Sequence, residues 1–336
     1  MAWKNPWYDP HLEHHTPEGF KNPEPELRQK GDLKKWQKER KASGLPLPPE
    51  EGYPAFISRW CQPVDLTGSE DAVWWLGHAA IMLRLAGQYT LIDPALSPRV
   101  SPVSFYGPQR KTPAPLQIAD LPSLSYVVIS HSHYDHLDRP TIKQILRRFP
   151  QVEFIVPLGL APWFKRMGAR RVTQLDWWQT VQLDSITFQA VPARHWTMRT
   201  LWDRNRSLWC GWVIKQAKLN FWFSGDSGYS DSLLAIPERL GPFNLLALPV
   251  GAYAPKWFMQ GQHMDPSQSV HLHQAAGCPL TIPVHWGVFE LADESLDEPP
   301  WVLDQALRDA GLASAFFYPW KIGQRYLLKN LIQDLS

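Results

Sequence analysis

The chain of 336 residues has only three cysteines, Cys61, Cys210 and Cys278, which stand far apart. Isolated cysteines in odd number form neither a disulfide framework nor a CxxC zinc site, and this usage favours a reducing compartment. No stretch approaches the roughly 18 apolar residues of a membrane-spanning helix. No apolar run follows the N-terminal residues as it would in a secretory signal. We therefore expect a cytoplasmic protein whose only membrane contact is peripheral.

The sequence also lacks an excess of charge of either sign. Its 34 Lys and Arg nearly balance 32 Asp and Glu, for a net charge of +2. No chain-wide positive field is therefore present to bind nucleic acid, which we do not expect as a partner. Apolar residues make up 44% of the chain and charged residues 20%, which excludes wholesale disorder. Proline, with 32 residues, and tryptophan, with 18, are unusually frequent.

Composition divides the chain into two parts with a boundary near residue 53. Residues 1–52 are rich in Pro and charge and lack apolar periodicity, apart from a helix-like polar stretch at 26–41. We expect an N-terminal extension there, in which His11, His14 and His15 are solvated. Residues 53–336 are expected to form a single catalytic domain.

From residue 72 onward, short apolar runs separated by turns predict strands, and helical patterns lie between several of them. This order predicts an α/β domain with two sheets packed face to face and helices outside, in four layers. The expected strands lie at 72–77, 80–85, 89–93, 126–130, 153–157, 186–192, 212–215, 219–224, 244–250 and 280–284. The expected helices lie at 141–149, 160–167, 230–240, 266–276 and 300–310.

The strongest local signal is the stretch SHSHYDHLD at 130–138, which follows directly on an apolar run. It holds four candidate metal ligands within six residues: His131, His133, Asp135 and His136. Because residues two apart on an extended segment share one side, His131 and His133 face together, and the chain turns before Asp135. That arrangement can serve two adjacent metal ions. A polar loop with capping roles is the alternative, but three His and an Asp at this spacing rarely arise for packing.

Three further candidate ligands, His195, Asp226 and His285, each follow a predicted strand. Singly, each is also explained as a core or capping residue, but strand ends are where such sheets build their sites. Imidazole and carboxylate ligands suit two Zn²⁺ ions, with Mn²⁺ or Fe²⁺ less favoured. We assign His131, His133 and His195 to one ion, Asp135, His136 and His285 to the other, and Asp226 as the bridging carboxylate.

Two other polar residues, His78 and Asp93, stand near strand ends without being needed to complete the coordination. We expect both to support the ligands from behind, Asp93 by orienting an imidazole. The alternative for Asp93 is a turn-forming role before Pro94.

A lipid substrate would need an apolar approach surface. Candidates are Trp257, Phe258 and Met259, and the stretch 196–209, which mixes Trp with Arg. The alternative for these Trp side chains is that they fill the core.

The motif HxHxDH at 131–136 resembles the signature of the metallo-β-lactamase superfamily. Within it, the closer resemblance is to the N-acyl-phosphatidylethanolamine-hydrolysing phospholipases D, carried by LDWW at 175–178, GAY at 251–253, WFM at 257–259 and QHMDP at 262–266. The resemblance runs from about residue 56 to 312. It implies an αββα sandwich with a two-zinc site on the ligands assigned above and an active-site histidine at His263. It departs at Ser104-Phe105, where we expect mammalian members to carry Gln-Tyr near the substrate amide.

Together these features predict a zinc-dependent phosphodiesterase of phospholipase D type. Its phospholipid substrate would be N-acyl-phosphatidylethanolamine or a related glycerophospholipid, cleaved to phosphatidic acid and N-acylethanolamine. The expected nucleophile is hydroxide held by the two ions, with Asp135 and His263 as catalytic residues; His263 would bind the phosphate or protonate the leaving oxygen.

Two other functions remain open on the sequence: a lactonase or other ester hydrolase on the same fold, and a non-hydrolytic iron redox module or scaffold. The sequence also leaves the oligomeric state open, with a homodimer as one option.

Overall fold

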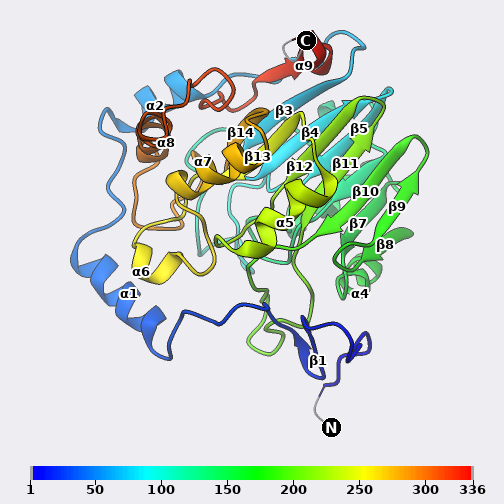
Figure 1. The fold of residues 1–336 in the computed structure, drawn as a ribbon, viewed down its shortest axis with the longest axis horizontal. Helices are drawn as coiled ribbons and strands as arrows, with labels where there is room; N and C mark the ends of the chain where they lie inside the picture. The colour runs from blue at the N-terminus through cyan, green and yellow to red at the C-terminus, as the bar shows by residue number, and fades with distance from the viewer. Residues whose placement is uncertain (1–2, 334–336) are drawn as a thin grey trace.

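The computed structural model describes residues 3–333, and two β-sheets form its centre (Figure 1). The first sheet has seven strands in the order β15-β3-β4-β5-β6-β7-β8. An antiparallel meander of β3, β4 and β5 continues into the parallel strands β6, β7 and β8, and β15 pairs antiparallel with β3. Their bounds are β3 Ala72–Gly77, β4 Ala80–Leu85, β5 Gln88–Ile92, β6 Tyr126–Val128, β7 Glu153–Pro157, β8 Arg171–Leu175 and β15 Arg325–Leu327.

The second sheet has six strands in the order β14-β13-β12-β11-β10-β9. The strands β9 to β12 pair antiparallel, and β13 and β14 then add to β12 in parallel. The bounds are β9 Thr180–Leu183, β10 Ile186–Val191, β11 Gly211–Gln216, β12 Leu219–Phe223, β13 Leu245–Pro249 and β14 Leu280–Val284. Apolar side chains of both sheets form one core, in which Trp75, Trp212 and Trp222 are fully buried.

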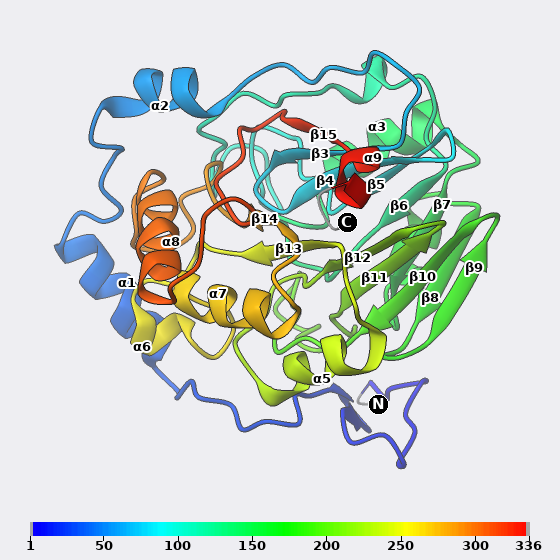
Figure 2. The ribbon, with the colours of Figure 1, turned by 45° about the horizontal axis from the view of Figure 1, so that its top comes forward.

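Helices cover the outer sides of the two sheets, with α5 and α7 lying across the second sheet (Figures 1 and 2). The amphipathic α3 buries Thr141, Ile142 and Ile145, and α7 begins with a capping box between Asp265 and Gln268. The helices are α1 Asp32–Ala42, α2 Gly52–Trp60, α3 Arg139–Arg148, α4 Ala161–Arg166, α5 Asp231–Leu240, α6 Lys256–Met259, α7 Pro266–Ala275, α8 Glu298–Asp309 and α9 Leu328–Gln333. None of these helices in residues 3–333 is both long and apolar enough to cross a membrane. The predicted αββα class is confirmed.

The N-terminal segment packs against the body of the molecule along much of its length. It forms the short hairpin of β1 (His15–Thr16) and β2 (Gly19–Phe20) and then the helix α1. His14 and His15 are buried, and their Nε2 atoms lie 2.7 and 2.8 Å from the two carboxylate oxygens of Asp176. The prediction that these two histidines are solvated is therefore wrong, because Asp176 lies some 160 positions away and local composition gives no sign of it; His11 is exposed.

Candidate metal centre

The structure brings all seven predicted ligands together at one edge of the two sheets. The stretch 131–136 follows β6, His195 follows β10, Asp226 follows β12 and His285 follows β14. In each case a buried, apolar strand ends and the next residues leave the sheet, which is where open sheets place polar sites.

Three imidazoles form the first group of candidate ligands. His133 Nδ1 lies 2.9 Å from His131 Nε2 and 3.1 Å from His195 Nε2. His195 Nδ1 donates to the carbonyl of Gln262 at 3.0 Å, so in the neutral ring its Nε2 offers a lone pair toward the other nitrogens. Nitrogen ligands about 2.0–2.1 Å from a tetrahedral zinc ion lie about 3.3 Å apart. The three nitrogens are therefore spaced much as ligands of one metal ion are.

The second group consists of Asp135, His136 and His285. Asp135 Oδ2 lies 3.4 Å from His136 Nε2 and 3.5 Å from His285 Nε2. Asp226 Oδ2 lies 3.1 and 3.0 Å from the same two nitrogens and 3.7 Å from His195 Nε2. Asp226 thus lies between the two groups, in the position of a bridging carboxylate.

The protonation chemistry of this donor set fits cations. Burial and the neighbouring His136 lower the pKa of His131 well below 6.5, and burial lowers the pKa of His133 to about 4 and of His195 to about 3. These rings are therefore neutral, as metal ligands must be. Burial also disfavours charge on His285, but Asp226 and Asp135 outweigh it and raise its pKa to about 9. The carboxylates of Asp135 and Asp226 thus favour a positive charge between them and His285. Either a proton on His285 or a divalent cation can supply that charge. His136 Nε2 and His285 Nε2 have no hydrogen-bond partner among residues 3–333.

The residues predicted to support the ligands lie directly behind them. Asp93 Oδ2 lies 2.7 Å from His136 Nδ1, and Asp93 also accepts from the backbone N–H of Ser130. His78 Nε2 lies 2.9 Å from Asp135 Oδ2, so that His78 joins the second group. His78, Asp93 and His285 all have positive φ, of 53°, 42° and 66°. Such backbone strain in non-glycine residues is typical of functional sites.

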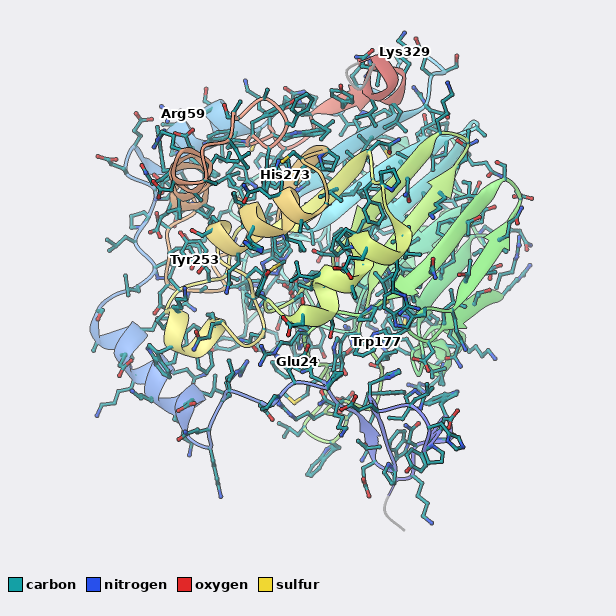
Figure 3. The ribbon with its side chains drawn as sticks, in the orientation of Figure 1. Glu24, Arg59, Trp177, Tyr253, His273 and Lys329 are labelled. Carbon is teal, nitrogen blue, oxygen red and sulfur yellow. The ribbon has the colours of Figure 1, made fainter. Side chains whose placement is uncertain are left out.

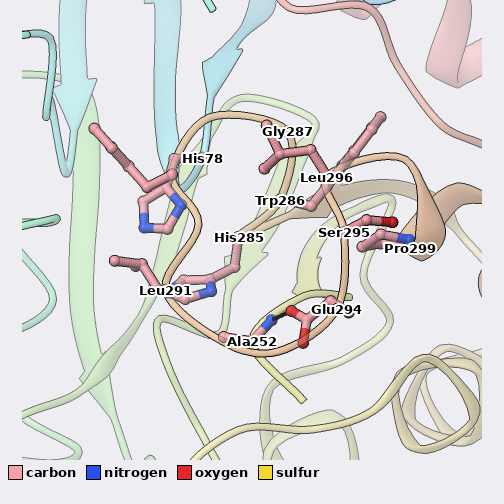
Figure 4. Close-up of a pocket in the computed structure, with 11 residues that line it drawn as sticks. His78, Ala252, His285, Trp286, Gly287, Leu291, Glu294, Ser295, Leu296 and Pro299 are labelled. Carbon is pink, nitrogen blue, oxygen red and sulfur yellow. Dashed lines mark hydrogen bonds between the residues drawn. The ribbon is translucent and has the colours of Figure 1, made fainter. Parts of the chain in front are cut away.

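A small cavity of about 10 Å³ lies behind His285 and His78 (Figure 4). This volume is about that of a single water probe. Glu294 lines the cavity and accepts from the backbone N–H groups of Ala252 and Ala254, which holds the loop after β13 against the site. Burial raises the pKa of Glu294 to about 7.

The candidate ligands open into a pocket of about 320 Å³. The predicted catalytic residue His263 lines it, with Nδ1 3.9 Å from Asp226 Oδ2 and its ring 5.0 Å from that of His285. Burial lowers the pKa of His263 well below 6.5, so this ring is neutral. The other walls come from Tyr134, Trp196, Gln262 and, unexpectedly, the N-terminal residues Arg28, Leu33 and Trp36.

The predicted lipid-facing residues differ from one another in exposure. Trp257 is 38% exposed, whereas Phe258 and Met259 are buried, because the indole of Trp36 stacks on Phe258 at 4.8 Å. Phe258 and Met259 therefore form no exposed surface, but both line the metal pocket, and their contact with lipid stays a prediction. Within the stretch 196–209, Trp202 is 76% exposed but Trp209 belongs to the core.

Sequence reasoning missed two residues that hold His195. The side chain of Asn22 accepts from the backbone N–H of His195 at 3.2 Å and donates to its carbonyl at 2.9 Å. Gln262 accepts from His195 Nδ1 through its carbonyl and from Trp196 Nε1 through its side chain. Gln262 stands beside His263 in the QHMDP motif, and this position could have marked it as a site residue. Asn22 lies 173 positions from His195, and no local pattern marks it.

Comparisons with known proteins agree with this geometry. Residues 88–286 match the family described as the beta-lactamase superfamily domain. An N-acyl-phosphatidylethanolamine-hydrolyzing phospholipase D from Caenorhabditis elegans is 40% identical over 227 residues, which are 65% of this chain and 64% of that protein. The mitochondrial enzyme of that name from Saccharomyces cerevisiae is 31% identical over 75% of this chain and 55% of its own length. The chain thus spans less than two thirds of either relative. The structure of a possible metal-dependent hydrolase from Veillonella parvula has a TM-score of 0.62 at 16% identity, covering 77% of this chain and all of that one.

Proposed function

From the premise that this chain belongs to the metallo-β-lactamase superfamily and is a metal-dependent hydrolase, we propose that it is a phosphodiesterase of the phospholipase D type. Its substrate is N-acyl-phosphatidylethanolamine or a related glycerophospholipid. The proposal rests mainly on the position of Asp226. Its carboxylate lies between the two groups of candidate ligands, and all of these line or adjoin one pocket. The 40% identity to an enzyme named for this reaction supports the choice of substrate class.

The proposed cofactors are two zinc ions, one on His131, His133 and His195, the other on Asp135, His136 and His285, with Asp226 shared. Imidazole and carboxylate donors suit zinc better than manganese or iron. Two such ions, when bound, polarise a phosphoryl oxygen and lower the pKa of water toward neutrality.

The residues of the chain orient the substrate and stabilise charge on its oxygens. His263 lies beside Asp226 with a neutral ring, so its N–H can donate a hydrogen bond to a phosphoryl oxygen or to the departing alcohol oxygen. Gln262 fixes His195 by accepting from its Nδ1, and Asp93 fixes His136 in the same way. The buried side chains of Phe258 and Met259 limit access of water to the pocket.

We propose that the lipid approaches over a neighbouring groove of about 920 Å³, which shares Tyr134 with the metal pocket. Loops on either side of the groove carry exposed apolar residues: Val103, Phe105 and Tyr106 on one, Leu201 and Trp202 on the other. A cationic groove between apolar tips suits the surface of an anionic phospholipid membrane. Its cations are Arg99, Arg139, Lys143, Arg166 and Arg199.

The position of Phe105 also bears on the head group. Phe105 is 83% exposed, and neither it nor Ser104 lines the metal pocket. Ser104 instead lines the neighbouring groove over which the lipid approaches. Plain phosphatidylethanolamine is therefore a substrate to test beside its N-acylated form.

The test is mass spectrometry of products from vesicles that contain both lipids, using protein with measured zinc content. We expect N-acylethanolamine and phosphatidic acid from the native chain and a rate lower by more than about 100-fold from His133→Ala, because loss of a ligand exceeds loss of a residue that supports one. In H₂¹⁸O, attack at phosphorus places the label in phosphatidic acid. Cleavage of the plain lipid alone would overturn the N-acyl substrate. Failure to cleave either lipid with two zinc ions bound would overturn the phosphodiesterase and favour the lactonase.

A further inference from the structure

The N-terminal segment forms one wall of the metal pocket. Arg28, Leu33 and Trp36 line the same pocket as His133, His195 and His263. The segment is held on both sides of this wall, because Asn22 pairs with the backbone of His195 and the indole of Trp36 donates to Asp293 at 2.9 Å. The wall is therefore tied directly to a candidate metal ligand.

Arg28 is the only Lys or Arg among the residues that line this pocket. Its guanidinium lies over the rings of Phe258, at 4.4 Å, and Trp196, at 5.3 Å, and it donates to the side-chain oxygen of Gln262. A guanidinium has five N–H donors, and within residues 3–333 Gln262 is the one hydrogen-bond partner that Arg28 has. Glu26 and Asp32 attract the guanidinium electrostatically, but no carboxylate of these residues forms an ion pair with it.

The neighbouring Arg204 makes a useful contrast. It lies over the same Trp196 ring at 4.7 Å, but it is paired with Glu26 at 2.8 Å. Burial, and then repulsion from Arg204, lower the pKa of Arg28 to about 10, so Arg28 keeps its charge at neutral pH. A half-buried cation with free donors, bonded to Gln262 and lining the same pocket as His263, is suited to an anion that enters the pocket.

We propose that Arg28 binds the phosphodiester anion of the substrate, at an oxygen that the metal centre does not hold. The N-terminal segment is then part of the substrate site. Arg28 sets the preference for a negatively charged diester over an uncharged ester. This inference rests on the proposed function for the identity of the anion.

The first experiment measures anion binding by the full-length, zinc-loaded protein, with inorganic phosphate as the probe in calorimetric titrations. Arg28→Gln should weaken phosphate binding about 10- to 100-fold, as expected for loss of a charge-assisted hydrogen bond. Arg28→Lys should fall between, because lysine keeps the charge but loses the planar fork. The matched control Arg204→Gln should change the affinity less than about twofold, because its charge is already paired. Thermal unfolding of each variant checks that the fold is kept.

The second experiment distinguishes the substrate phosphate from free phosphate. KM for N-acyl-phosphatidylethanolamine in mixed micelles should rise in Arg28→Gln by a factor similar to the loss in phosphate affinity. An unchanged phosphate affinity in Arg28→Gln, or an equal loss in Arg204→Gln, would overturn the inference, and so would a lost phosphate affinity with an unchanged lipid KM. If Arg28→Gln alone loses phosphate binding and the native chain cleaves no phospholipid, the anion site stands and the proposed function fails.

Discussion

Asp226 is the residue of the candidate metal centre that contacts the most imidazole groups. Its Oδ2 lies within 3.9 Å of five imidazole nitrogens, those of His131, His136, His195, His263 and His285. Burial favours the neutral acid, but His136 and His285 reverse this and hold the pKa of Asp226 well below 3.8. The carboxylate is therefore charged and available to two cations at once.

Asp226→Asn is expected to remove that shared charge while keeping the shape of the side chain. We expect zinc affinity to fall at least about 100-fold, beyond what loss of a supporting residue causes. The measurement is zinc content after dialysis against a series of chelator concentrations. Asp304→Asn on the exposed face of α8 is the control. Two zinc ions retained in Asp226→Asn would contradict the bridging assignment.

His273 lies on α7 (Figure 3), belongs to none of the candidate metal groups within residues 3–333 and provides a test of pH dependence. Burial lowers its pKa to about 4, and its Nδ1 lies 2.8 Å from Thr281 Oγ1. The unfolded chain binds a proton near pH 6.5, whereas the folded chain does not until about pH 4, so stability is lost as pH falls through this window. Between pH 7.5 and 5 the native chain should lose about 2 kcal/mol more than His273→Asn. Denaturant unfolding of the zinc-free proteins measures the difference; equal losses would refute it.

Local spacing explains why the metal ligands were predictable and Arg28 was not. His131 to His136 fall within six residues, and His195, Asp226 and His285 each follow an apolar strand. Arg28 reaches Gln262 across 234 positions, and no composition or periodicity marks such a contact.

At the scale of elements, buried strands and capped helices were predictable, whereas exposed edges were not. The strands from β3 to β7 and from β10 to β14 contain short runs of mostly apolar residues, and α7 begins with the capping residue Asp265 and Pro266. The strands β8 and β9 lie next to each other in sequence at the sheet edges, are half-exposed and carry few apolar residues. The helix α1 falls largely within the helix-like polar stretch at 26–41, but it has no buried residue, so no apolar periodicity marks its bounds.

The two histidines of the N-terminal hairpin pair with a single acid. Nε2 of His14 and Nε2 of His15 lie against the two carboxylate oxygens of Asp176, and the His14 ring stacks at 4.3 Å on Trp177, which Figure 3 labels. The backbone N–H of Phe20 also donates to the carbonyl of Asn205 at 2.9 Å. Burial opposes ionisation of Asp176, but the hydrogen bond from His14 keeps its pKa lowered. The carboxylate thus pairs with both histidines at neutral pH.

Asp176→Ala should leave Nε2 of both buried histidines without a partner and so release the hairpin, although the backbone N–H of Asp9 still donates to His15 Nδ1. We expect a loss of about 2–4 kcal/mol in unfolding free energy, from two unsatisfied buried groups. Limited proteolysis should then cut within residues 3–30 before the rest of the chain. His11→Ala, which alters an exposed histidine nearby, should have neither effect. Unchanged protection of the hairpin in Asp176→Ala would show that other contacts hold it.

At the scale of the whole molecule, the net charge of +2 conceals an uneven distribution. Five Lys and Arg residues line the groove beside the metal pocket, and Asp203 is the one acid there. The composition excludes an excess of positive charge over the whole chain, but it does not exclude a cluster of positive charge at one place on the surface. Of the large apolar side chains that the structure describes, the four most exposed lie on the two loops that flank the groove: Phe105, Tyr106, Leu201 and Trp202. Charge and apolar surface therefore coincide on one face, next to the pocket that the proposed lipid must enter.

This coincidence predicts where the protein meets a membrane. Replacing Phe105 and Trp202 together by Ala should weaken binding to vesicles containing phosphatidylglycerol at least about tenfold, because each ring contributes roughly 1.5–3 kcal/mol when it is buried. Sedimentation with vesicles measures this directly, and added NaCl should weaken the binding of the native chain because the groove is cationic. Trp301→Ala is the matched control, since Trp301 is 62% exposed on α8 and lines no part of the groove. An equal loss in the control would mean that exposed aromatic residues bind lipid wherever they lie. The prediction that the groove binds the membrane would then be wrong.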